Sequence, residues 1–395
     1  MAEQISGSLP LSDLTQRLAA PGSDVWAVHY DALARQQAGE AIILLSVGDP
    51  DFDTPPYISS YVIEQINKGR THYSPAAGEP QLRQTIAQME TRNTGRTIAP
   101  EQVVIFPGGT ATLYATLACI LNPGDGVIIP EPMYVGYHGI TETIGAERQT
   151  VPLSLPTFEL TVDAIVNRIE PNTRAVLINT PGNPCGNLIP DTVLRELAVV
   201  CRQHNLWLIC DEVYSLIAFE QPHVSLLNCT EDLSNIVVVD GLSKSHAMSG
   251  WRVGWAITSD VMAGALTRLS GSAFFGTSQF VQDAAAYALA NDAEDVEQMR
   301  VEYRNRRDYV VSRVKQIAGL QLHTPSGGMF VMIDVSGVAE SGEAFSRGLL
   351  DSQGVAVLPG TCFGPSGDAY VRLSLTEPTQ VLGDALDRVS AFVNT

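Results

Sequence analysis

The chain has 395 residues, of which 45% are hydrophobic and 17% charged, which predicts a globular protein of about two domains and excludes a disordered chain. Its formal net charge of −19 argues against nucleic acid or an anionic membrane surface as a partner, because both require a basic face. The six cysteines are scattered without a C-x-x-C pair, and no segment resembles a membrane span or a secretory signal, so we expect a cytoplasmic protein with reduced thiols and no bound metal.

Short aliphatic and β-branched runs alternate with helix-length segments through the middle of the chain. These runs lack a two-residue alternation of apolar and polar side chains, which indicates parallel strands buried on both faces of an α/β sheet. The predicted strands are Gln102–Phe106, Gly126–Pro130, Arg174–Asn179, Trp207–Cys210 and Ile236–Val239. The predicted covering helices include Ala111–Leu121, Asp191–His204 and Phe280–Ala290.

The character of the sequence changes near Asn291. A charged helical pattern follows at Glu294–Ile317, and mixed strands and helices continue to the end of the chain. We therefore predict a large domain over residues 46–290 and a smaller α+β domain over residues 291–395. Residues 1–45 are predicted to form an N-terminal arm that is part of the small domain.

Lys244 is one of only three lysines, and the other two, Lys68 and Lys315, have the surroundings of solvated helix residues. Lys244 follows the strand Ile236–Val239 and lies among small residues, where shielding from water would favour the neutral amine that condenses with an aldehyde. Arg252 follows in the same segment and offers a planar fork to a phosphate. Aldehyde and phosphate together suggest pyridoxal phosphate. These two residues alone fit a surface lysine and an unrelated arginine equally well.

Polar residues also follow the other predicted strands, at the sheet edge where α/β proteins bind ligands. Gly109 and Thr110 come between the first strand and a helix, where free N–H groups can bind an anion, although a plain turn is the simpler interpretation. Asn183 follows the third strand in a loop rich in proline and glycine, which is either structural or able to donate to a ring oxygen or a carboxylate.

Asp211 comes directly after the next strand. A carboxylate at a buried strand end needs a partner, and a protonated pyridine nitrogen would be one. Tyr214 lies close enough in sequence to reach the oxygen of such a ring, and Tyr134, after the second strand, could stack on it. A helix cap and packing tyrosines are the alternatives. What favours the cofactor is that all these signals fit one ring, one phosphate and one amine.

With these residues in this order, the chain resembles the fold-type I pyridoxal-phosphate-dependent aminotransferases of class I/II. Residues 241–254 fit the lysine attachment signature of that family, and the likeness spans nearly the whole chain. The resemblance implies an α/β large domain with a mostly parallel seven-stranded sheet between helices, a smaller α+β domain and pyridoxal 5′-phosphate as cofactor. It also implies a homodimer with shared active sites, in which Tyr73 reaches the phosphate of the neighbouring subunit.

The resemblance further implies a role for each candidate residue. Lys244 would hold the cofactor and transfer a proton between substrate and cofactor. The other cofactor-binding residues would be Gly109, Thr110, Tyr134, Asn183, Asp211, Tyr214, Ser243 and Arg252, with Tyr73 from the neighbouring subunit. Gly48, Asn183 and Arg372 would bind the substrate, and Arg372 would hold its α-carboxylate. One departure is Gly241, where many members carry a phosphate-binding serine; Ser243 is the remaining candidate for that contact.

Four stretches are most similar to bacterial arginine–pyruvate transaminases: Leu45–Pro55, Glu131–Tyr137, Leu242–Trp255 and Gly327–Ile333. We therefore expect ping-pong transfer of an amino group from arginine, or another basic or broad donor, to a 2-oxo acid such as pyruvate. Acidic residues near the pocket would favour a guanidinium, and the candidates are Asp24, Asp31 and Glu131, although a solvated charge is the simpler interpretation of each.

Other activities stay open from the sequence. An aspartate- or aromatic-preferring aminotransferase would use the same residues, as would a lyase or synthase on the same fold. A transcription regulator with an aminotransferase-like domain would need an added DNA-binding domain, for which residues 1–45 are too short and insufficiently basic. A cofactor-free structural relative would not be expected to keep Lys244, Asp211 and Arg252 together.

Overall fold

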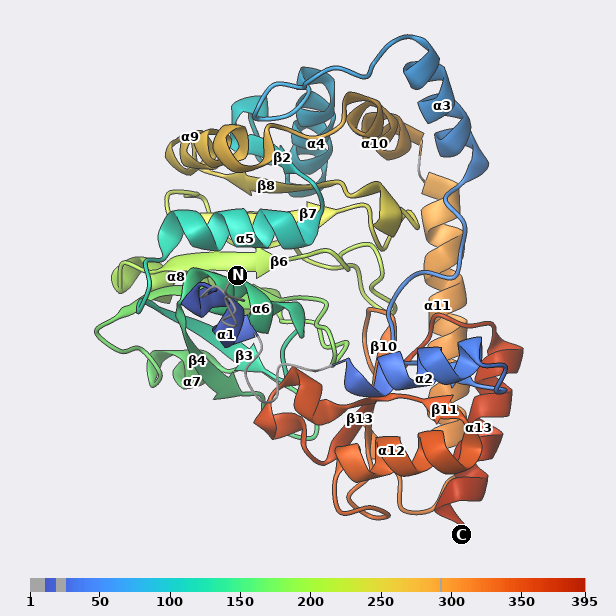
Figure 1. The fold of residues 1–395 in the computed structure, drawn as a ribbon. Helices are drawn as coiled ribbons and strands as arrows, with labels where there is room; N and C mark the ends of the chain where they lie inside the picture. The colour runs from blue at the N-terminus through green and yellow to red at the C-terminus, as the bar shows by residue number, and fades with distance from the viewer. Residues whose placement is uncertain (1–10, 19–25, 292, 395) are drawn as a thin grey trace, which may run out of the picture.

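The computed structural model describes residues 11–18, 26–291 and 293–394. Its largest sheet has seven strands in the order β2-β8-β7-β6-β5-β3-β4 and lies in the middle of the molecule (Figure 1). Its strands are β2 (Val103–Phe106), β3 (Gly126–Glu131), β4 (Glu147–Pro152), β5 (Thr173–Asn179), β6 (Trp207–Asp211), β7 (Ile236–Gly241) and β8 (Gly254–Thr258). The pairs from β7 to β4 are parallel, and β8 is antiparallel to both of its neighbours. The predicted fold class is confirmed.

The five predicted strands correspond to β2, β3, β5, β6 and β7, and their ends agree within one or two residues. The predicted list lacks β4 and β8. The sequence of β4 is polar and its residues are only partly buried, as expected of a strand at the sheet edge. The pairing of β2 was not predicted either, because it hydrogen-bonds to the antiparallel β8 rather than to a parallel neighbour.

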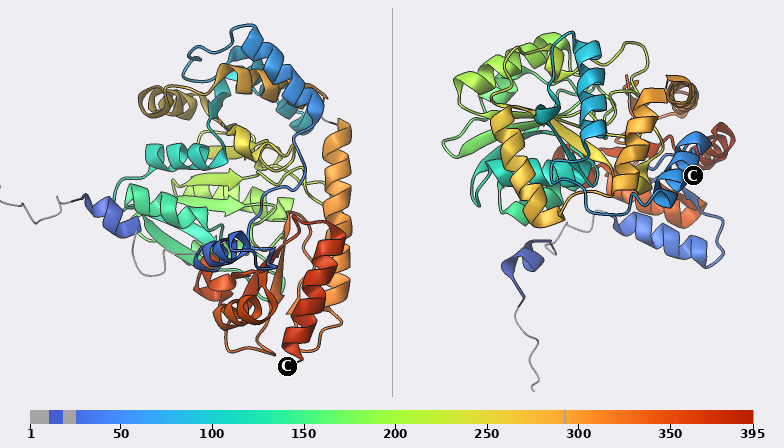
Figure 2. Two further views of the ribbon diagram at one scale, coloured as in Figure 1. Left: turned by 45° about the vertical axis from the view of Figure 1, so that its right-hand side comes forward. Right: turned by 90° about the horizontal axis from the view of Figure 1, so that it is seen from above.

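Both faces of the sheet are covered by helices, as Figure 2 shows. Successive residues of β7 contribute to different hydrophobic clusters: Val237 and Val239 to one, Ile236 and Val238 to the other. The first cluster includes α5 (Gly109–Ile120), α6 (Gly136–Ile144) and α9 (Asp260–Leu269). The second includes α4 (Pro80–Thr94), α8 (Asp191–Gln203) and α10 (Gln279–Asn291), and α3 (Pro56–Asn67) packs on α10. Burial on both faces explains the apolar runs that marked these strands in the sequence.

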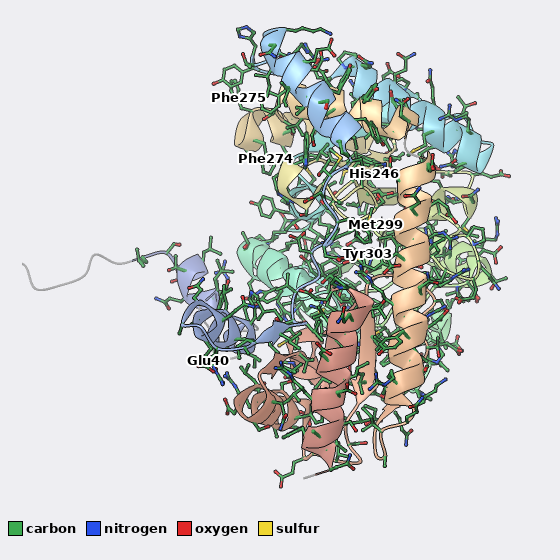
Figure 3. The ribbon with its side chains drawn as sticks, turned by 90° about the vertical axis from the view of Figure 1, so that its right-hand side faces the viewer. Glu40, His246, Phe274, Phe275, Met299 and Tyr303 are labelled. Atoms are coloured by element: carbon green, nitrogen blue, oxygen red, sulfur yellow. The ribbon has the colours of Figure 1, made fainter. Side chains whose placement is uncertain are left out.

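The C-terminal elements form an α+β arrangement. An antiparallel sheet has the order β12-β13-β10-β9, with β9 (Gln321–Leu322), β10 (Phe330–Asp334), β12 (Leu358–Pro359) and β13 (Tyr370–Ser374). Around it lie α11 (Ala293–Val314), α12 (Gly342–Gln353) and α13 (Thr379–Val393). The long helix α11 runs along one side of the molecule (Figure 1), and its Met299 and Tyr303, labelled in Figure 3, are buried in the cluster beneath it.

The N-terminal segment lies beside these C-terminal elements. Strand β1 (Ile43–Leu44) pairs in parallel with β11 (Val355–Ala356), and α2 (Ala27–Gln37) contacts α12. The short helix α1 (Asp13–Leu18) instead contacts α6. The domain boundaries at residues 45 and 290 stay a prediction. None of the helices in the described part of the chain is long and apolar enough to cross a membrane.

Candidate active site

A cavity of about 470 Å³ lies at the carboxyl ends of β5 and β6, between the N-terminus of α5 and the C-terminal elements. The predicted site residues that line it are Gly48, Gly109, Thr110, Tyr134, Asn183, Asp211, Tyr214, Ser243, Lys244, Arg252 and Arg372. They come from distant parts of the chain, and the fold brings them to one volume. Tyr73 does not line this cavity; it is 79% exposed and packs edge-on against Phe275, with 4.8 Å between the ring centroids.

Lys244 lies on the segment after β7, and its Nζ donates to the carbonyl oxygen of Gly48 at 2.8 Å. Burial lowers the pKa of this amine to about 8, against the opposing effect of the Asp49 charge. Gly48 has no alternative here, because a Cβ at that position would lie 2.1 Å from Cζ of Phe330. The lysine is therefore held at the cavity wall by a backbone carbonyl, with a pKa suited to accepting and releasing a proton near neutrality.

Asp211 ends β6 and is 3% exposed. One carboxylate oxygen accepts from the hydroxyl of Tyr137 at 2.8 Å and the other from the backbone N–H of Val213 at 3.3 Å. Burial raises the pKa of this carboxyl to about 6, although both hydrogen bonds lower it. Among the described residues, no cationic side chain lies within ion-pair distance of it, which suits a cationic ligand atom in the cavity. Sequence reasoning missed Tyr137, which lies three positions after Tyr134 in the same segment.

Arg372 lies on β13 and is 2% exposed. Its guanidinium donates to Oδ1 of Asn183 at 3.0 Å and to the carbonyl of Ser46 at 2.6 Å, while Nε has no partner among the described residues. Its Cζ lies 4.0 Å from the centroid of the Phe330 ring. Burial lowers the pKa of this arginine to about 10. A buried guanidinium without a carboxylate partner is a ready site for a carboxylate ligand.

Asn183 links this arginine to the neighbouring tyrosine. While its Oδ1 accepts from Arg372, its Nδ2 lies 3.5 Å from the hydroxyl of Tyr214. Its own backbone N–H donates to Oδ1 of Asn179 at 2.7 Å, which fixes the loop after β5. The amide and the hydroxyl therefore face the cavity from adjacent strand ends.

The other end of the cavity suits an anion. The first turn of α5 contributes Gly109 and Thr110, where a helix leaves N–H groups unbonded. Arg252 lines the same region, with Nη1 donating to the carbonyl of Ser249 at 2.8 Å. At Gly241 a Cβ would meet the carbonyl oxygen of Val253 at 2.9 Å, which leaves no comfortable place for a serine. Ser243, the remaining candidate for a hydroxyl contact to the phosphate, lines the cavity.

The acidic residues considered for a guanidinium donor do not line the cavity. Asp31 lies 3.5 Å from Arg347 in a partly exposed ion pair. Glu131 is turned away and accepts from the backbone N–H of Ser366 at 2.7 Å. Asp24 is outside the described residues. Neither Asp31 nor Glu131 therefore lines the pocket. Asp31 is a partly exposed charge, as the simpler interpretation predicts, whereas Glu131 is 5% exposed and is not solvated. The carboxylates on the cavity wall are Asp49 and Asp211.

The fold and the cavity define an enzyme of the aminotransferase type. The chain belongs to the aminotransferase class I and II family, whose sequence profile matches residues 40–389. It is 42% identical to the arginine–pyruvate transaminase AruH of Pseudomonas aeruginosa, over 96% of this chain and 97% of the relative. It is 32% identical to an aspartate aminotransferase of Pyrococcus horikoshii, over 89% and 90% of the two chains. The structure of the Thermus thermophilus aspartate aminotransferase with maleate is also similar, with a TM-score of 0.92 and 31% identity, covering 98% of this chain and all of the other.

Proposed function

We propose that this enzyme transfers an amino group from an L-amino acid to a 2-oxo acid with pyridoxal 5′-phosphate as cofactor. The observation that carries the proposal is the single cavity that holds a lysine of lowered pKa, a buried unpaired carboxylate and two arginines. Membership of the aminotransferase family supports it. The charges in the cavity match a phosphate, a pyridine nitrogen and an α-carboxylate.

The residues present fit the cofactor. Arg252 and the N-terminal turn of α5 would hold its phosphate, and Asp211 would pair with its ring nitrogen. Tyr214 and Asn183 would donate to its ring oxygen, and Tyr134 would stack on the ring. When bound, the cofactor supplies the aldehyde carbon and the electron-withdrawing ring that make the Cα proton of an amino acid acidic.

The chain itself supplies binding and proton transfer. Arg372 would bind the α-carboxylate of the amino acid and so present its Cα to Lys244. The Lys244 amine would accept the Cα proton and return it on the cofactor side, as a base and then as an acid. A 2-oxo acid would then bind the same arginine, and the steps would run in reverse. The two substrates therefore use one site in turn, which gives ping-pong kinetics.

We propose arginine or another basic amino acid as the donor and pyruvate as the acceptor. The similarity to the arginine–pyruvate transaminase supports this choice. The aspartate and aromatic aminotransferases among the relatives define the alternative donors.

The exposed aromatic pair supports a homodimer with shared sites. Tyr73 is 79% exposed and Phe275 is 63% exposed, and Figure 3 labels Phe275 at the surface beside Phe274. Exposed neighbouring aromatic rings suit a protein–protein contact. In the proposed dimer Tyr73 would reach the phosphate held by the partner subunit.

Replacement of Lys244 tests the proposed function. We expect Lys244→Ala to bind pyridoxal phosphate without covalent attachment and to lose turnover by at least about 10⁴-fold, because the proton carrier is removed. Lys315→Ala, which changes an exposed lysine in the turn after α11, should keep both attachment and turnover. The measurements are the absorption spectrum after borohydride treatment and amino-group transfer to pyruvate. Undiminished transfer by Lys244→Ala would overturn the assignment.

A further inference from the structure

One carboxylate on the cavity wall has no partner. Asp49 follows Gly48, whose carbonyl holds Lys244, and it lines the same cavity. Among the described residues, its side chain makes no hydrogen bond or ion pair. The next acid along the chain, Asp51, differs, because Arg306 binds it at 2.7 Å. Asp49 is also exposed, so its charge is available to a ligand entering from solvent.

The other charged groups of the cavity are matched to the cofactor and to the α-carboxylate. Asp211 lies at the buried strand end, and Arg252 and Arg372 lie where anionic groups would bind. Asp49 is therefore the charge left over for the part of the amino acid that varies, its side chain. Asp49 adjoins Gly48, whose carbonyl accepts from Nζ of Lys244 at 2.8 Å, so this carboxylate lies on the backbone segment that contacts the reacting lysine.

An aromatic side chain lines the same cavity as this carboxylate. Trp26, which precedes α2, lines the cavity and is partly buried, and Val135 lines it beside Tyr134. The ring of Phe330 is already covered by the guanidinium of Arg372 at 4.0 Å, whereas no arginine or lysine of the described residues lies over Trp26. An indole face can cover both a methylene chain and a cationic group.

We propose that Asp49 binds the cationic end of the donor side chain while Trp26 covers its methylene stem, so that the enzyme selects guanidinium or ammonium amino acids. A carboxylate forms a two-pronged pair with a guanidinium and repels the side chains of aspartate and glutamate. This inference rests on the proposed aminotransferase function, because Arg372 and Lys244 must fix the amino acid for its side chain to reach this wall.

The test compares arginine with citrulline, which has the same length and shape but no charge. The rate at which each amino acid changes the absorption spectrum of the holoenzyme is measured for wild type, Asp49→Asn, Asp49→Glu and Asp53→Asn. Asp53→Asn is the matched control, because it removes the same charge from an adjoining groove and does not line the cavity. The ratio of the two rate constants cancels any general change in Lys244.

We expect wild type to prefer arginine over citrulline and Asp49→Asn to reduce that ratio by at least about tenfold, since the two-pronged pair between carboxylate and guanidinium is lost. Asp49→Glu and Asp53→Asn should keep ratios within about threefold of wild type. The inference is overturned if Asp49→Asn slows both donors equally, or if wild type responds to neutral or acidic amino acids but not to arginine. A holoenzyme that responds to no amino acid would instead overturn the proposed function.

Discussion

Two cavities flank the segment that carries Lys244. The first, described above, is lined by Ser243 and Lys244, and the second is lined by Asp240, Gly241 and Ser245. The second is larger, at about 660 Å³, and acidic residues dominate its charge. Size alone would therefore favour the second cavity over the candidate active site.

The difference lies in a buried arginine rather than in the carboxylates. In the second cavity Glu212 lies 3.2 Å from the His223 ring and accepts from the backbone N–H of Leu226 at 2.8 Å. Asp240 accepts from the N–H of Gly241 at 2.6 Å and from the hydroxyl of Ser215 at 3.2 Å. In the first cavity Asp211 accepts two hydrogen bonds in the same way, but Arg372 is also there, 2% exposed and, within the described part of the chain, without a carboxylate partner. Unpaired buried charges cost folding energy, so they indicate a site built for a ligand.

Replacing Asp211 in the first cavity and Asp240 in the second should separate the roles of the two cavities most strongly. We expect Asp211→Asn to slow the reaction with amino acid by about 10³-fold, because a neutral amide cannot keep a ring nitrogen protonated. Asp240→Asn should slow it by less than about threefold, because desolvation raises the pKa of Asp240 well above its usual value and an amide resembles the protonated carboxyl. Single-turnover rates measure both. Equal losses in the two variants would contradict the distinction between the cavities.

Replacing an arginine in each cavity should give a smaller difference in activity between the two cavities. Arg372→Lys keeps the charge but removes the planar fork, so kcat/KM for both the amino acid and the oxo acid should fall by about 10²-fold. Arg300 lines the second cavity and pairs with Glu297 at 2.6 Å, an exposed i,i+3 partner. Arg300→Lys should change kcat/KM by less than about twofold. Both values of kcat/KM come from steady-state kinetics with the concentration of each substrate varied. A larger decrease for Arg300→Lys than for Arg372→Lys would argue against a carboxylate site at Arg372.

The sequence was informative where a local pattern carries the signal. The apolar runs located the buried strands, and the polar residues after them located the cavity. The residue types at Lys244, Asp211 and Arg252 supported the family resemblance, and the fold placed all three around one volume.

What the sequence could not predict depends on contacts between distant segments. The polar edge strand β4 carries no apolar run to mark it. Asp31 and Glu131 lie in or near segments that border the site, but the fold engages their side chains with Arg347 and Ser366. Asp49 was not predicted as a site residue. Only the tertiary structure shows that it lines the cavity and that its side chain makes no hydrogen bond or ion pair within the described part of the chain. The role of Tyr73 stays a prediction that requires a second subunit.

The smallest expected effect concerns stability, at Glu90 in the second cavity. Burial and then the charge of Glu212 raise the pKa of Glu90 to about 7, above its ordinary value of 4.5. The folded protein therefore holds this proton where the unfolded chain has lost it, and the associated stability decreases as pH rises from about 4.5 through about 7. Glu90→Gln removes this pH-dependent loss of stability. The difference in thermal midpoint, variant minus wild type, should therefore be about 2–4 °C larger at pH 8 than at pH 5. Calorimetry at the two pH values measures this difference. The control is Glu340→Gln at an exposed position, whose thermal midpoint should differ from that of wild type by the same amount at both pH values. A pH-independent shift for Glu90→Gln would show that the pKa of Glu90 is not raised in the folded protein, and a loss of amino-group transfer would show that the second cavity takes part in the reaction.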